Sequence, residues 1–266
     1  MVKDQKGYVN VMKKLTKLVP QEDGTYVRMP KDMCYLLNYN ILKLLNRARR
    51  CGPLDMPELH CDTNVFPDYL ALYSQKSLYH TSQMTAVCFY SFDIEFDGRN
   101  GLFWAIYFDD KKRLSYFKER FKNVKFFISP DYSVFGDIHK MENLYRIFRA
   151  RIIALWFSLE LHAVVIPNAS YADPESFSLY FSGLEKCSVI AMSAKSHIRY
   201  ASERKLFESA IRYAVDNLPL KAIIVYSACG KDQTCLKSFE YAINHGVKVI
   251  IPENTLRSRN MQRRAG

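Results

Sequence analysis

A chain of 266 residues, 48% of them hydrophobic, can bury one good core, so we expect one domain with an extension and not two full domains. Its net charge of +11 disfavours strongly basic ligands and favours nucleic acid, a nucleotide or an acidic protein as partner. No apolar run reaches membrane-spanning length, and seven scattered cysteines without a CxxC pair are typical of reduced thiols. We therefore expect a soluble, cytoplasmic protein that does not enter a membrane.

Residues 1–50 are predicted to form a basic helical extension. Val11, Met12, Leu15 and Leu18 recur at helical spacing, and a second apolar helical pattern covers residues 31–50. The basic side chains of this extension that could contact phosphates are Lys13, Lys14, Lys17, Arg47, Arg49 and Arg50. Arginines near the end of a helix also complement its dipole, so both interpretations remain open.

Residues 51–85 contain three prolines and few periodic runs, which predicts an irregular connector. From residue 86 an apolar run reaches Phe96, and a second apolar run extends from Leu102 to Asp110. Between them lie two turn signals, Asp-Gly at 97–98 and Asn-Gly at 100–101, which supply the positive φ of tight turns. The pattern predicts a β-hairpin.

Further along, short apolar runs alternate with amphipathic segments. The predicted strands cover residues 124–128, 163–166, 188–192, 222–226 and 247–251. The predicted helices cover residues 114–121, 141–159, 177–184, 207–218 and 236–243. Continuous apolar strands separated by such helices predict an α/β fold with a mostly parallel sheet covered on both faces. We expect one α/β domain over residues 86–255, followed by a basic flexible tail at 256–266 that offers Arg257 and Arg259 to phosphates.

The regular succession of strand and helix favours a barrel-like arrangement, such as an incomplete TIM-type barrel, over a doubly wound open sheet. With the hairpin, seven strands are predicted, one short of a closed eight-stranded barrel unless residues 52–84 supply another. In both architectures ligands bind at the carboxyl ends of the strands. The predicted position of a site therefore does not depend on strand order.

Polar side chains gather at these predicted strand ends. The candidate catalytic residues are Asp131, Asp109, Lys195 and His197. The candidate ligands of Mg²⁺ or Mn²⁺ are Asp109, Asp131, Asp173 and Glu253. The remaining candidates for ligand binding are Ser129, Asn168, Tyr171, Ser193, Ser227 and Lys231. Each of these side chains could instead cap a helix or a turn, and only their number on one face favours a site.

Several junctions occur together at a specific spacing. They are Phe127-Ile128-Ser129-Pro130-Asp131-Tyr132-Ser133-Val134-Phe135-Gly136-Asp137, Leu144-Tyr145-Arg146, Arg149-Ala150-Arg151, Val165-Ile166-Pro167-Asn168 and Phe181-Ser182-Gly183. In these features, from about Phe103 to Glu253, the chain resembles a family of bacterial, phage and mobile-element proteins, the domain of unknown function 4417. The resemblance implies a single α/β domain and a phage or mobile-element context, and it implies no reaction.

The chain also departs from the pattern of that family. Tyr171 stands where a tryptophan is typical, and Ser182 where an aspartate is typical. A glycine that usually follows the strand ending here in Ser193 and Ala194 is missing. If that glycine allowed the backbone to approach a phosphate closely, its loss puts such a use in doubt here.

Three functions fit the sequence. The first is a nucleic-acid- or nucleotide-binding protein of a phage or mobile element, because the net charge is a direct observation. The second is a metal-dependent enzyme that processes a phosphodiester or a nucleotide with the carboxylates of the strand ends. The third is a protein-interaction module that acts on a host factor. A GxGxxG motif after a strand and a GKS or GKT loop are absent, which disfavours a dinucleotide fingerprint and a P-loop.

Overall fold

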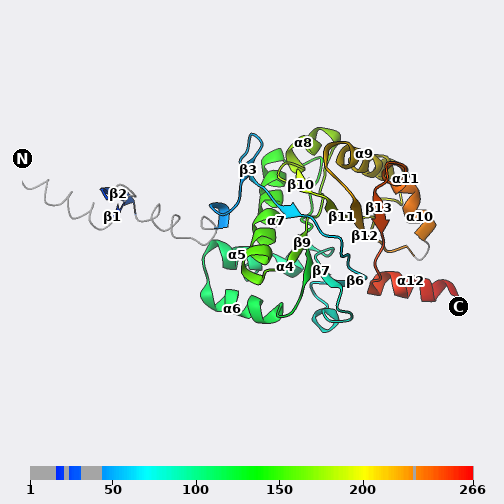
Figure 1. The fold of residues 1–266 in the computed structure, drawn as a ribbon, viewed down its shortest axis with the longest axis horizontal. Coiled ribbons are helices and arrows are strands. Elements are labelled where there is room, and N and C mark those ends of the chain that lie inside the picture. Colours follow the sequence, from blue (N-terminus) through cyan, green and yellow to red (C-terminus); the bar gives the residue numbers. More distant parts are fainter. Residues whose placement is uncertain (1–15, 21–23, 31–43, 230–231, 266) are drawn as a thin grey trace, which may run out of the picture.

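The computed structural model describes residues 16–20, 24–30, 44–229 and 232–265. Seven of its strands run in parallel in two sheets (Figure 1). The first sheet contains, in spatial order, β6 (Tyr69–Leu72), β7 (Thr85–Cys88), β8 (Phe126–Ile128) and β9 (Val164–Ile166). The second contains β11 (Val189–Ser193), β12 (Ala222–Tyr226) and β13 (Lys248–Ile250). The α/β prediction with a mostly parallel sheet is confirmed.

Isolated parallel bridges join the two sheets at both of their edges. Asn168, just beyond β9, bridges to Ala191 of β11, and Tyr69 of β6 bridges to Glu253, just beyond β13. Leu70 N donates to Glu253 O at 2.8 Å, and Ala191 N donates to Pro167 O at 2.8 Å. No closed sheet is formed by the residues that the structure describes. The barrel-like arrangement therefore stays a prediction.

Helices cover the strands (Figure 1). The longer ones are α6 (Lys111–Arg120), α7 (Lys140–Leu161), α9 (Ala201–Asn217) and α12 (Thr255–Ala265). The short ones are α4 (Asp93–Phe96), α5 (Leu102–Tyr107), α8 (Phe177–Tyr180), α10 (Asp232–Leu236) and α11 (Glu240–Asn244), with 3-10 turns η1 (Lys76–Leu78), η2 (Pro174–Ser176) and η3 (Lys237–Phe239). Every residue of β7 and β12 is buried under them, which explains why these strands read as continuous apolar runs. None of the described helices could span a membrane.

Aromatic side chains fill much of the core between α7 and the first sheet. Phe157 of α7 stacks on Phe127 of β8 with ring centroids 4.0 Å apart. Phe121 meets Phe157 edge-on at 5.4 Å, and Phe89 stacks on Phe157 at 5.9 Å. Such pairs add to the burial of apolar area, so this cluster holds the longest helix against β8.

The predicted hairpin over residues 87–110 is wrong. Only β7 is a strand, and it ends at Cys88; α4 and α5 occupy the rest. In α5 the buried residues are Leu102, Phe103, Ala105 and Ile106, which repeat at helical and not at strand spacing. A short run that is apolar nearly throughout does not show this period in the sequence.

Residues 51–85, predicted as an irregular connector, supply β6 to the first sheet. They also contribute β4 (Met56–Pro57) and β5 (His60–Cys61), while β3 (Arg50–Cys51) pairs with β4 and β10 (Lys186–Cys187) pairs with β5. The two larger parallel sheets hold seven strands, but the set differs from the predicted one: the connector provides the edge strand β6, and the second predicted hairpin strand is helix α5. The division of the chain into domains stays a prediction.

The N-terminal helices were predicted in a part of the chain that is only partly described. Thr16–Pro20 (β1) and Tyr26–Pro30 (β2) form an antiparallel pair, so a helix reaching Leu18 is wrong. Helical structure ends at residue 45, and Arg50 lies in β3, so the second predicted helix does not reach residue 50. Residues 1–15 and 31–43, which hold the remainder of both predicted helices, lie outside the described residues.

Residues 256–265, which were predicted as part of a basic flexible tail, belong to helix α12 (Thr255–Ala265). Arg257 of this helix is buried and forms ion pairs with Glu253 at 2.6 Å and Asp232 at 2.5 Å. Asn254 accepts a hydrogen bond from Arg257 N at 3.0 Å and so caps the first turn. The sequence of residues 256–266 offers few apolar side chains to bury, and the contacts that hold the start of the helix are polar.

Substitution of Gly183 tests the close contact between this residue and the segment 51–61. Its φ is +85°, and a Cβ there would lie 2.6 Å from Pro57 O. We expect Gly183→Ala to lower the free energy of unfolding by about 2–4 kcal/mol in urea titrations. Gly246→Ala is the matched control, because Gly246 has a φ of +79° and nothing within 4 Å of its Cβ position. Equal losses in the two variants would contradict the close approach at Pro57.

Candidate functional site

Hydrogen bonds between polar groups connect the turn that follows β8 to the turn that follows β9. Ser129 N donates to Ile166 O at 3.0 Å, and Ser129 Oγ accepts from Asn168 N at 2.8 Å. The side chains then meet, because Asn168 Nδ2 donates to Asp131 Oδ1 at 2.7 Å. Two residues that the sequence places at separate strand ends therefore form one pair.

Asn168 uses its whole side-chain amide within this network. Its Oδ1 accepts from Tyr90 OH at 2.9 Å, and its Nδ2 also donates to Ser170 Oγ at 3.0 Å. Tyr90 is buried against Tyr226, with ring centroids 4.8 Å apart. Because the side-chain N–H groups and the side-chain oxygen of Asn168 are all hydrogen-bonded within the protein, Asn168 orients the carboxyl group of Asp131. Asp131, and not Asn168, is then the residue that would contact a ligand.

Asp131 is half-buried and has an unusual ionisation. Burial raises the pKa of its carboxyl group to about 7. The hydrogen bonds from Asn168 and Ser170 and the positive charge of Lys195 lower the pKa, and the negative charge of Asp93 raises it. Near neutral pH the group is thus present in both protonation states, so it can donate or accept a proton.

A hollow of about 200 Å³ opens over this carboxyl group; we call it the Asp131 hollow. Asn168, Tyr171, Ser193 and His197 line it together with the loop at 132–135. The His197 ring lies 5.6 Å from that of Tyr171, and burial lowers the pKa of His197. The Tyr171 hydroxyl is buried without a hydrogen-bond partner among the described residues. Predicted residues from β8, β9 and β11 therefore lie around one cavity.

A second hollow of about 240 Å³, the Lys195 hollow, lies at the same carboxyl ends. Its lining consists of Leu72, Gln75, Lys195, Tyr226, Asn254, Thr255, Leu256 and Arg259. Lys195 N donates to the Oγ of Ser193, which lines the Asp131 hollow, at 3.3 Å, so the two hollows are neighbours. We call the surface that carries both hollows the carboxyl-end face.

Other predicted site residues have separate structural partners. Asp109 follows helix α5 and not a strand, since the predicted hairpin is wrong, and it pairs with Lys111 at 2.7 Å. Asp173 caps η2 by accepting from Ser176 N at 2.8 Å. Glu253 binds Arg257, Ser227 Oγ accepts from Cys229 N at 3.0 Å, and Lys231 lies outside the described residues.

The four predicted metal ligands thus engage four different partners. Among the described residues, no group of three or more His, Cys, Asp or Glu side chains could hold a metal ion. The assignment of Asp109, Asp131, Asp173 and Glu253 to Mg²⁺ or Mn²⁺ stays a prediction.

The basic residues predicted to bind nucleic acid do not lie together. Lys13, Lys14 and the side chain of Lys17 lie outside the described part of the chain. Arg47 pairs with Glu160 at 3.5 Å and Arg50 with Asp55 at 3.9 Å, while Arg49 is exposed. Arg49 O accepts a hydrogen bond from Glu58 N, and the chain then continues from Glu58 to β5. Strand β5 pairs with β10, which precedes β11 in the chain. These arginines are therefore attached near the amino end of β11, whereas Arg259 lies at the carboxyl-end face.

Exposed apolar side chains lie on the segments that lead away from the carboxyl ends of the strands, and one of them, Phe135, lines the Asp131 hollow. They come from the segments that follow β7, β8 and β11, and they are Phe92 (80% exposed), Ile94 (83%), Phe135 (49%), Met141 (72%) and Tyr200 (59%). Asp93, between the first two, accepts from Ser133 N at 3.2 Å, which joins the segment after β7 to the one after β8. Large apolar side chains gathered beside a cavity are typical of a binding surface.

Sequence reasoning missed Tyr90, Ser170 and Tyr226. Tyr90 comes two residues after the end of β7, but the strand was predicted to continue to Phe96. Tyr226 was recognised only as the last residue of its strand. A correct end for β7 would have placed Tyr90 beside Asn168.

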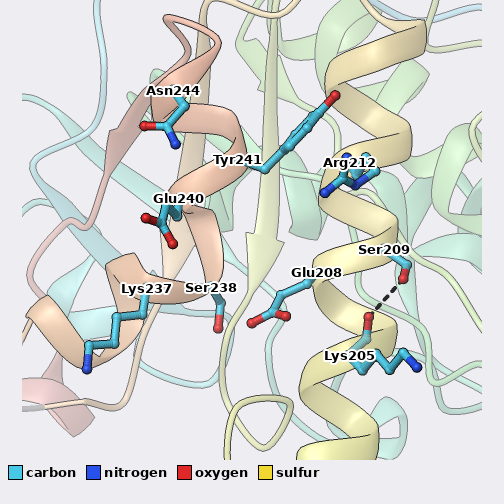
Figure 2. A pocket seen from close by; sticks show the side chains of 9 residues that line it. All are labelled: Lys205, Glu208, Ser209, Arg212, Lys237, Ser238, Glu240, Tyr241 and Asn244. Atoms are coloured by element: carbon cyan, nitrogen blue, oxygen red, sulfur yellow. Dashed lines mark hydrogen bonds between the residues drawn. The ribbon is translucent and has the colours of Figure 1, made fainter.

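The outer layer carries a larger groove of about 440 Å³ between α9 and the segment η3–α11 (Figure 2). Lys205, Arg212 and Lys237 contribute positive charge to it, and Glu208 and Glu240 negative charge. Arg212 lies 4.0 Å from the centre of the Tyr241 ring. With charges of both signs and none of the predicted site residues, this groove is separate from the carboxyl-end face.

Comparisons with known proteins identify a matching family and relatives from phages. The family model for the domain of unknown function DUF4417 matches residues 48–242. The "Gene 1 protein" of Mycobacterium phage L5 is 24% identical over 190 residues, which are 71% of this chain and 77% of that protein. The "Gene 1 protein" of Mycobacterium phage D29 is 23% identical over 100 residues, 37% of this chain and 36% of that protein. No solved structure matches the chain.

Proposed function

We propose that this chain, which belongs to the DUF4417 family, binds nucleic acid in single-stranded form, or a nucleotide, through its carboxyl-end face. The similar proteins come from phages, and a phage or mobile element is the context that we propose for this activity. The observation that carries the proposal is that exposed aromatic side chains follow β7, β8 and β11, and that the Lys195 hollow at the same strand ends is lined by two cations.

Bases of a single strand stack on exposed aromatic rings, and the backbone phosphates require nearby positive charge. Phe92, Phe135 and Tyr200 supply the rings at this face. Arg199 lies 5.4 Å from the centre of the Tyr200 ring, and Lys195 and Arg259 are exposed residues that line the Lys195 hollow. The net charge of +11 adds a sequence-independent attraction that weakens as salt is raised.

The test is fluorescence anisotropy with labelled single-stranded DNA and RNA. Phe92→Ala and Tyr200→Ala should each raise Kd about tenfold, as expected when one stacked base is lost. Tyr116→Ala is the matched control, because Tyr116 of α6 is similarly exposed (54%) and contributes to neither hollow. No measurable binding by the unaltered protein, or an equal loss in Tyr116→Ala, would count against this face.

A second function is favoured by one specific observation, the pKa of Asp131 near 7. A carboxyl group tuned to this range can act as a general acid or base, so the face could process the nucleotide or phosphodiester that it binds, with or without a divalent metal. Incubation with DNA, RNA and nucleotides, with and without Mg²⁺ or Mn²⁺, tests this alternative. Turnover that is abolished in Asp131→Asn supports it, and absence of turnover across the panel rejects it.

The bridges at Asn168 and Tyr69 support a related proposal about architecture. They connect the two parallel sheets at both edges, as the strands of an incomplete barrel would be connected. The carboxyl-end face is then the rim of that barrel, where loops from successive strands meet.

A further inference from the structure

We propose that the Lys195 hollow is a binding site for a phosphate group. The chemistry is the same whether the phosphate belongs to a nucleic-acid backbone, to a nucleotide or to the free anion. The inference rests on the proposed function only for the source of that phosphate, because the site itself stands on the geometry of the hollow.

The described residues that line the hollow carry only positive charge. Lys195, just beyond β11, and Arg259, in α12, are the charged members among them, and none of them is a carboxylate. Asp232 and Glu253, on flanking segments, are bound by the buried Arg257. Two unneutralised cations beside one small cavity attract a doubly charged anion more strongly than a singly charged one.

A hydroxyl group at the wall of the hollow points to the same ligand. The Tyr226 side chain is 1% exposed and lines the hollow, and its hydroxyl takes part in no hydrogen bond among the described residues. Burial raises the pKa of Tyr226 above its ordinary value, so the hydroxyl keeps its proton and remains a donor at neutral pH. The stack on Tyr90 fixes the ring. A phosphate oxygen would satisfy a donor that the protein leaves without a partner.

The first turn of α12 forms another part of the wall. Thr255 and Leu256 line the hollow at the start of this 11-residue helix, where backbone N–H groups and the helix dipole favour an anion. Thr255 Oγ1 is held by Gln75 Nε2 at 3.2 Å and lies 3.1 Å from Tyr69 OH. These bonds connect α12 to β6 and η1, so the wall is fixed before a ligand arrives.

The size of the hollow limits what it can take. At about 240 Å³ it is smaller than the roughly 300–1,000 Å³ of pockets that enclose a whole drug-sized ligand. It fits one group of a larger molecule, and the hydrogen bond from Lys195 N to Ser193 Oγ connects it to the Asp131 hollow. A nucleotide phosphate bound here would direct the rest of the molecule toward Asp131 and the aromatic rim.

The experiment is isothermal titration of the full chain with inorganic phosphate at constant ionic strength. Lys195→Gln and Arg259→Gln should each weaken phosphate binding about tenfold, and Tyr226→Phe about fivefold, as expected for the loss of hydrogen bonds to a charged group. Arg263→Gln is the matched control, since Arg263 is exposed on the same helix, one turn further on, and does not line the hollow. Its affinity should stay within about twofold of the unaltered protein.

Two further arms identify the source of the phosphate and separate this inference from the proposed function. Nucleoside monophosphates are compared with the same nucleosides without phosphate, and phosphate is tested as a competitor of a short single-stranded oligonucleotide. Phosphate binding that follows the variants supports the site, and it rejects the proposed function if the oligonucleotide does not bind and the nucleoside monophosphates bind no more tightly than phosphate. The opposite outcome overturns the site and leaves the proposed function standing. In that outcome the oligonucleotide binds, phosphate does not reduce its binding, and the binding changes equally in Lys195→Gln, Arg259→Gln and Arg263→Gln.

Discussion

Replacing Asp97 by alanine is expected to lower the free energy of unfolding by about 3–5 kcal/mol, because it leaves the guanidinium of Arg149 buried without its carboxylate. Arg149 Nη1 donates to Asp97 Oδ2, and the two side chains are only 11% and 6% exposed. The Arg149 guanidinium also lies 4.5 Å from the centre of the Tyr132 ring and 5.0 Å from that of Tyr145. These rings pack against the cation but cannot replace its counter-ion.

Urea unfolding followed by circular dichroism measures the loss. The exposed pair of Lys140 and Glu175, whose atoms are 2.9 Å apart, provides the control. Glu175→Ala should cost less than about 1 kcal/mol, since solvent screens such a pair and solvates the remaining charge.

A double variant, Asp97→Leu with Arg149→Met, separates the cost of an unpaired charge from the worth of the pair. Replacement of both charges by apolar groups is expected to recover most of the stability lost in Asp97→Ala. A loss in Asp97→Ala no larger than that in Glu175→Ala would contradict the burial of Arg149. A double variant no more stable than Asp97→Ala would contradict the role of the unpaired charge.

The alternation from α6 onward could be predicted because β8, β11 and β12 are buried on both faces and the longer helices between them are amphipathic. Strand β12 was predicted at Ala222–Tyr226, where the structure has it. The same rule failed at Leu102–Tyr107, because a helix with four of six residues buried carries no visible polar face. It failed again at β6, since four residues after a proline-rich stretch are too few to establish a period.

The candidate site also has one part that could be predicted from the sequence and one part that could not. The meeting of Asp131 with Asn168 follows from sequence, because each comes directly after a strand and β8 and β9 are parallel neighbours. The Lys195 hollow does not follow from sequence. It requires Arg259 to be carried to the strand ends by α12, and that helix is held by the buried Arg257 and the cap of Asn254. Such polar tertiary contacts leave no periodic signal.

The ionisation of Asp131 predicts a pH-dependent stability with a definite sign. The pKa of its carboxyl group is about 7 in the folded protein and 3.8 in its ordinary state. Between these values the unfolded chain releases a proton that the folded chain keeps, so rising pH favours unfolding. The stabilisation is fully present below about pH 4 and is lost by about pH 8, and it is equivalent to as much as roughly 4 kcal/mol.

Urea titrations of the unaltered protein and of Asp131→Asn, from pH 4 to pH 8, measure this effect as the difference between the two proteins. The groups that act on Asp131 are Asn168, Ser170, Asp93 and Lys195, and all remain in the variant. The stability advantage of the unaltered protein should therefore shrink steadily up to about pH 7 and then level off. Asp137→Asn, at an exposed position on the same loop, should show a difference that changes by less than about 0.5 kcal/mol over this range. A flat difference for Asp131→Asn as well would show that the carboxyl group titrates normally, and it would remove the basis for assigning acid–base chemistry to this face.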